Sequence, residues 1–150
     1  MNKDLTNREY EVLKLVAENK SNTQIANMLS ISIHTVKAHI CSIIEKLNAN
    51  GDWFYTEMDK ILTDHQIPHC LNHVGSLGCV FFTEEKVKDY VTAKMSDTEV
   101  FAKYFKYLLT HGIYMAPSQF EAIFLSGAHT KEKELKKTLE VIDACCAAIK

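Results

Sequence analysis

The residues with the clearest chemical potential lie between positions 32 and 47, where a polar face follows a helical pattern. Apolar side chains recur there at i, i+4, i+7, i+8 and i+11, which predicts one buried stripe made of Val36, Ile40, Ile43, Ile44 and Leu47. The opposite side carries small, polar and basic residues, namely Thr35, Lys37, Ala38, Cys41, Ser42 and Glu45. Small side chains let a helix approach the major groove of DNA, where a lysine can bond guanine edges. The spacing alone fits an ordinary three-helix core with a solvated face better.

Two shorter helices are predicted before that segment. Thr6 with Glu9, and Ser21 with Gln24, each match the capping box that opens a helix. Apolar residues follow each box at helical spacing, and Ser30–Ser32 forms a turn in which Ser32 can cap the third helix. The first 50 residues therefore indicate three helices, of which the third presents the polar face.

These helices resemble the helix-turn-helix of LuxR-type transcriptional regulators. The family pattern L-T-x-R-E stands at residues 5–9, S-N-x-x-I-A at 21–26, S-x-x-T-V-K-x-H at 32–39, and K-L at 46–47. The resemblance implies that double-stranded DNA is the partner and that Lys37 and Ala38 face its bases, with Cys41 on the same face. It also implies that Asn22, Thr35 and Lys46 lie near phosphates, where contacts set register but read no sequence.

The chain departs from the family in its charge and in the segment after the third helix. Family members often carry basic residues at the positions of Cys41 and Glu45, and a glutamate there repels phosphate. Residues 1–50 hold six Lys and Arg against five Asp and Glu, a net charge of only +1, so we expect weak binding by a monomer. The family's fourth helix, which serves dimerisation, has no counterpart after Leu47. The polar, glycine-containing segment Asn48–Asp52 predicts instead a joint between domains 1–50 and 51–150.

Residues 53–148 predict a mixed arrangement of helices and strands, which makes the whole chain α+β. Helices are expected up to Asp64, from a capping box of Ser96 and Glu99 to Gly112, and from Thr130 onward. Strands are expected at 77–82, 113–115 and 120–126.

This second region resembles the carboxy-terminal small domain of fold-type I pyridoxal-phosphate enzymes, and most closely glutamate-1-semialdehyde 2,1-aminomutases. The matching blocks are HVGSL at 73–77, FFT at 81–83, SDTE at 96–99, GIYMAPSQFEA at 112–122 and SGAHT at 126–130. The resemblance implies that Glu121 matches a substrate-site glutamate. Nothing matches the lysine-bearing segment of the large domain, so we expect no cofactor and interpret Glu121 as vestigial. Ile44–Leu47 also matches the helix that precedes this region in the aminomutases, so the third helix could instead run directly into it.

Composition narrows the remaining possibilities. The net charge of −2 argues against a protein that is held to nucleic acid by bulk charge. No apolar run approaches 18 residues and the amino terminus is not signal-like, so we expect a cytoplasmic protein that does not enter a membrane. Five cysteines show no CxxC spacing. His65, His69 and His73 repeat every four residues, but Pro68 interrupts the helix that would align them, so we expect no metal site.

Three functions therefore compete. The first is a transcriptional regulator that binds DNA, alone or as a homodimer, with the second region used for packing, dimerisation or sensing. The second is a non-catalytic fusion remnant, and the third is a partial aminomutase that needs its large domain from another chain. The intact helix-turn-helix motif favours the regulator, and we do not expect an enzyme.

Overall fold

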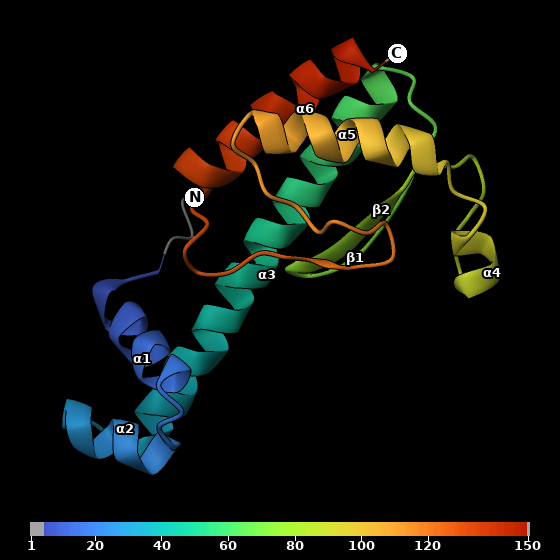
Figure 1. The fold of residues 1–150 in the computed structure, drawn as a ribbon. Coiled ribbons are helices and arrows are strands. Elements are labelled where there is room, and N and C mark those ends of the chain that lie inside the picture. The colour runs from blue at the N-terminus through green and yellow to red at the C-terminus, as the bar shows by residue number, and fades with distance from the viewer. Residues whose placement is uncertain (1–4, 150) are drawn as a thin grey trace.

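The computed structural model describes residues 5–149 as six α-helices, a π-helical turn and a three-stranded sheet. The helices are α1 (Asn7–Ala17), α2 (Asn22–Leu29), α3 (Ile33–Asp64), α4 (Tyr90–Ala93), α5 (Thr98–Thr110) and α6 (Lys136–Ala148). The strands are β1 (Cys70–Val74), β2 (Leu77–Phe81) and β3 (Ile123–Phe124), and the π-helical turn η1 (Lys131–Leu135) leads into α6. Figure 1 shows α1 and α2 at one end of α3, with the sheet, α5 and α6 gathered around the other end.

The long helix α3 runs for 32 residues through the segment Asn48–Asp52, where the sequence predicted a joint. That segment is helical because its glycine is used for close packing. Gly51 is buried, and a Cβ atom there would lie 2.6 Å from the carbonyl carbon of Gly75 and 2.7 Å from the Cα of Ser76. The β1–β2 turn thus rests directly on the helix backbone, which only a glycine permits. The two regions share one continuous helix, as the alternative interpretation of residues 44–47 anticipated.

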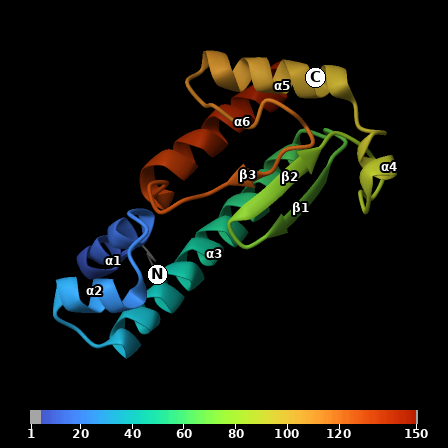
Figure 2. The same cartoon turned by 60° about the horizontal axis from the view of Figure 1, so that its bottom comes forward.

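The sheet is antiparallel, in the order β1-β2-β3, and one of its faces packs on the helices. Leu71 and Val80 on that face join a core formed with α3, α5 and α6, in which Met58, Leu62, Leu108 and Ile142 are fully buried. The other face is partly covered by α4 and the segment before it, through a small cluster around Phe81. Figure 2 shows α3 running beneath the sheet toward α6.

Many of the predicted helix and strand ends are confirmed. Thr6 and Ser21 form the expected capping boxes, Ser32 caps α3, and α3 ends at Asp64. Strand β2 lies within the predicted range, and Gly112 follows α5 with a positive φ of 80°.

Other local predictions were wrong. Asp97 caps α5, accepting hydrogen bonds from the amides of Glu99 and Val100, whereas Ser96 is buried one residue earlier. Residues 113–115 form no strand, because Met115 turns into the helical core instead of pairing with a neighbour. Strand β3 covers only two of the residues predicted at 120–126, since a turn from Ser118 to Glu121 precedes it. Strand β1 and the short helix α4 were not predicted.

Candidate nucleic-acid interface

The helix-turn-helix is built by α1, α2 and the first half of α3 around a small apolar core. Its buried members are Val12, Ile25, Ala26, Val36 and Ile43. Between α2 and α3, Ser30 adopts the left-handed conformation (φ 53°) that ends α2, and Ser32 Oγ accepts a hydrogen bond of 3.0 Å from the amide of Thr35. Arg8 Nη2 donates to the carbonyl oxygen of Leu29 over 2.7 Å, which fastens the end of α2 to α1. The end of α2 is therefore fixed to α1, and the start of α3 is capped by Ser32.

The polar face of α3 is open to solvent. Five of the residues assigned to it are exposed, namely Thr35, Lys37, Ala38, Cys41 and Glu45. Ile44, which the spacing assigned to the buried stripe, is 52% exposed, because α1 and α2 cover only the side that carries Val36, Ile43 and Leu47. Figures 1 and 2 both place the start of α3 at the end of the molecule farthest from α5 and α4. The second region therefore leaves this face uncovered.

The other two residues expected at the interface are less exposed. Asn22 is half-buried in the first turn of α2. Lys46 is also half-buried, and its Nζ donates to Glu9 Oε2 over 2.7 Å. The structure thus places Lys46 in an ion pair inside the helix-turn-helix.

Glu9 is the centre of a buried polar network that the sequence did not reveal. Its side chain is almost fully buried, and it accepts hydrogen bonds from the Thr6 amide (2.7 Å), Ser42 Oγ (2.6 Å) and Lys46 Nζ (2.7 Å). Burial opposes ionisation, but these bonds outweigh it and lower the pKa of Glu9 to about 2. The capping box signalled only the bond to Thr6. The bonds to Ser42 and Lys46, more than 30 residues away, join α1 to α3.

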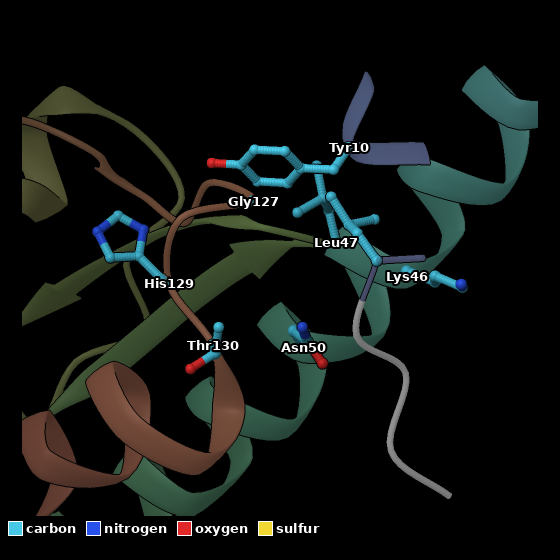
Figure 3. Close-up of a pocket in the computed structure, with 8 residues that line it drawn as sticks. Tyr10, Lys46, Leu47, Asn50, Gly127, His129 and Thr130 are labelled. Atoms are coloured by element: carbon cyan, nitrogen blue, oxygen red, sulfur yellow. The ribbon is translucent and has the colours of Figure 1, made fainter. Parts of the chain in front are cut away.

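A second contact fixes the helix-turn-helix to the rest of the chain. The loop before η1 crosses α1 at Gly127, where a Cβ atom would lie 2.8 Å from Leu13 Cδ2 and 3.1 Å from Leu5 Cδ1. Beside this seam is a cavity of about 180 Å³, lined by Leu5, Tyr10, Lys46, Leu47, Asn50, Gly127, His129 and Thr130. Figure 3 shows that its walls come from α1, α3 and the loop. The polar face of α3 is therefore presented in a fixed orientation.

Comparison with protein families identifies this first region. Residues 3–56 match the family described as bacterial regulatory proteins, luxR family. The helix-turn-helix formed by α1, α2 and the first half of α3 is of the LuxR type. The match extends past the polar face of α3 into the part of the helix that packs against the second region.

The region after the LuxR-type segment is similar to aminomutases. The glutamate-1-semialdehyde 2,1-aminomutase 1 of Lachnoclostridium phytofermentans is 48% identical over 105 residues, covering 70% of this chain and 24% of that protein. The aminomutase of Aquifex aeolicus is 57% identical over 72 residues, covering 48% of this chain and 17% of that protein. An omega-transaminase from Sphaerobacter thermophilus shares the fold, with a TM-score of 0.65 and 16% identity, over 78% of this chain and 27% of that one. The chain thus spans about a quarter of the length of the relatives it matches.

The residues with possible enzyme chemistry lie apart from one another and away from the polar face of α3. Glu121 is exposed at the turn before β3. The three spaced histidines each face a different carboxylate: His65 lies 2.7 Å from Asp143, His69 lies 3.1 Å from Asp59, and His73 lies 3.6 Å from Asp52. Within residues 5–149, no three His, Cys, Asp or Glu side chains gather as metal ligands would, and no helix is long and apolar enough to span a bilayer.

Proposed function

We propose that this protein is a DNA-binding transcriptional regulator that inserts the first turns of α3 into the major groove. The observation that carries the proposal is the exposure of Thr35, Lys37, Ala38 and Cys41 on a helix whose orientation is fixed. A recognition helix needs both exposure and a fixed orientation. Its side chains must reach base edges while its backbone stays in register with the groove. The LuxR-type family match supports the same role. The proposal implies a cytoplasmic protein, because bacterial DNA lies there.

In this proposal some residues of the interface contact DNA bases and others contact phosphates. Lys37 is the exposed cation of the face and is assigned to base edges, with Ala38 and Cys41 allowing close approach. Thr35 and Asn22 are assigned to phosphates, since they lie at the starts of α3 and α2, where backbone amides also attract anions. Lys46 is the least favoured of the predicted contacts, because Glu9 already holds its ammonium group.

The charge of the face supports binding as a dimer. Glu45 is exposed on the same side as Cys41 and opposes the approach of phosphate, so one copy gains little from counterion release. Two copies on an inverted repeat would double the base contacts and place two α3 helices in successive major grooves. In this proposal the aminomutase-like region packs against α3 and keeps it rigid.

Selection of bound duplexes from a random pool tests the proposal. We expect an enriched inverted repeat, bound with an affinity that falls steeply as salt rises. Lys37→Ala should weaken binding about tenfold or more, as expected for the loss of a base contact. Lys103→Ala removes another exposed lysine, on α5, and should leave binding unchanged. Failure to enrich any sequence at low salt, or equal effects of the two substitutions, would overturn the proposal.

A second candidate, a non-catalytic remnant or partial aminomutase, is supported by the close similarity of residues beyond the helix-turn-helix to about a quarter of an enzyme. Absorbance spectroscopy with added pyridoxal phosphate separates these possibilities. A partial enzyme that still holds the cofactor would shift its spectrum, whereas a regulator or a remnant would leave it unchanged. A remnant would also bind no selected duplex.

A further inference from the structure

One face of the sheet is left open by the protein's own helices. Residues that pair directly across antiparallel strands project to the same face, and the pairs Val74–Leu77 and Leu77–Phe124 therefore form one row across all three strands. Val74 is 83% exposed, Leu77 39% and Phe124 74%. A hollow of about 380 Å³ lies beside this row. We call the row Val74, Leu77 and Phe124 the open row.

The face of the sheet that carries the open row lacks the charged residues expected of a face that meets water. Its outward positions on β1 and β2 are Cys70, Asn72, Val74, Leu77, Cys79 and Phe81, none of which is charged. A sheet face that meets water normally carries polar side chains, because alternation places apolar residues on the core side. Here the outward positions are apolar apart from Asn72, whose side-chain amide donates to the carbonyl oxygen of Val87. Helix α4 and the cluster around Phe81 cover one end of this sheet face. At the other end, Val74 and Phe124 of the open row are exposed to solvent.

A separate pair of exposed aromatic side chains lies at α4, near the end of the sheet that carries Phe81. Tyr90 is 67% exposed and Phe120 48%, and their ring centroids are 5.8 Å apart. An exposed row of apolar side chains on an uncharged sheet face is the usual composition of a docking surface.

The matched relatives are much longer than the part that this chain matches. They continue for about three quarters of their length beyond the matched part. In the present chain, α3, α5 and α6 already fill the opposite face of the sheet. The open face is thus the side of the sheet on which a larger body can still pack.

We propose that the open row binds the large domain of an aminomutase-type chain supplied by a separate polypeptide. This inference does not depend on DNA binding, because the open row lies on the sheet and the polar face of α3 lies at the far end of that helix (Figure 1). It would connect a LuxR-type segment physically to an enzyme of the aminotransferase fold.

Co-expression tests the proposal with a defined partner. The probe is the Lachnoclostridium phytofermentans aminomutase shortened by the carboxy-terminal part that this chain matches, expressed with the full-length, tagged protein. We expect the shortened enzyme to be recovered as a one-to-one complex, measured by light scattering. The double variant Leu77→Lys with Phe124→Lys should reduce the recovered partner more than about tenfold, because two charges would enter an apolar contact.

Matched controls make each outcome decisive. Leu109→Lys places a lysine at a similarly exposed leucine on α5, and Lys37→Ala alters only the polar face of α3, so both should retain the complex. Circular dichroism checks that every variant folds. The proposal is overturned if the shortened enzyme is not recovered with the wild-type chain, or if recovery survives the double variant. It is also overturned if the protein alone forms a dimer that the double variant dissociates, because the occupant would then be a second copy.

Discussion

The two regions joined by α3 are stabilised in different ways. The core of the helix-turn-helix has five buried apolar residues and a buried carboxylate, Glu9, that accepts hydrogen bonds from three donors. The larger core, formed by the second half of α3 with the aminomutase-like region, has fifteen buried residues, and no charged side chain among residues 57–149 is buried. A segment of about 50 residues is marginal by itself. The difference indicates that the larger core fixes the position of α3. The smaller core determines the conformation around the end of α3 that carries the polar face.

Gly51→Ala should have the largest effect on this arrangement. Alanine favours a helix over glycine by about 1 kcal/mol, but the new Cβ would collide with the backbone of the β1–β2 turn, at 2.7 Å from Ser76 Cα. We expect a net loss of about 3 kcal/mol in the free energy of unfolding, measured by urea denaturation.

Gly112→Ala is the matched glycine control. Its φ of 80° makes alanine strained, but no atom lies near the new Cβ, so the expected loss is about 1 kcal/mol. If Gly51→Ala were neutral or stabilising, α3 would not be packed against the turn, and the two regions would be less tightly joined than described.

Glu9→Gln should weaken the LuxR-type segment by about 2 kcal/mol, because a charge-assisted bond to Lys46 is lost and the half-buried ammonium keeps no anionic partner from Glu9. Amide hydrogen exchange should accelerate in α1 and the first half of α3 and stay unchanged in α5 and α6.

Glu11→Gln provides the surface comparison for that experiment. Glu11 pairs with Arg8 in solvent, so its loss should change stability by less than about 0.5 kcal/mol. Equal effects of the two substitutions would mean that the buried network does not stabilise the segment.

The smallest expected effect is a difference between the two regions in how their stability depends on pH. Because the pKa of Glu9 is about 2 in the folded protein, its stabilisation is complete above the ordinary value of 4.5 and is lost as the pH falls from 4.5 toward 2. Burial raises the pKa of Cys145 to about 12, so its stabilisation is present below 9 and is lost as the pH rises from 9 toward 12.

Hydrogen exchange across this range should therefore show the LuxR-type segment loosening first in acid and the aminomutase-like region first in alkali. Glu9→Gln should remove the acid response. An acid response of α1 that persists in Glu9→Gln would contradict the assignment of that response to the buried carboxylate.

The sequence predicted features that depend on neighbouring residues and missed those that depend on distant ones. The caps at Thr6, Ser21 and Ser32 are local hydrogen bonds with a fixed spacing, and all three are present. Gly51 was interpreted as part of a joint between two domains, because the close approach of Gly75 cannot be seen in the local sequence pattern. Likewise, Glu9 gave no sign of burial, since Ser42 and Lys46 reach it only after α1 packs on α3.

Thiol footprinting with a selected duplex measures directly whether α3 enters the groove. Cys41 is exposed in the middle of the polar face of α3, while Cys79 is half-buried in β2, where burial raises the pKa of its thiol. Mass spectrometry can follow the alkylation of both cysteines in one sample. We expect saturating duplex to slow the alkylation of Cys41 and to leave the rate at Cys79 unchanged. An unchanged rate at Cys41 in the presence of bound DNA would contradict DNA reading by α3, because the helix would then lie outside the groove.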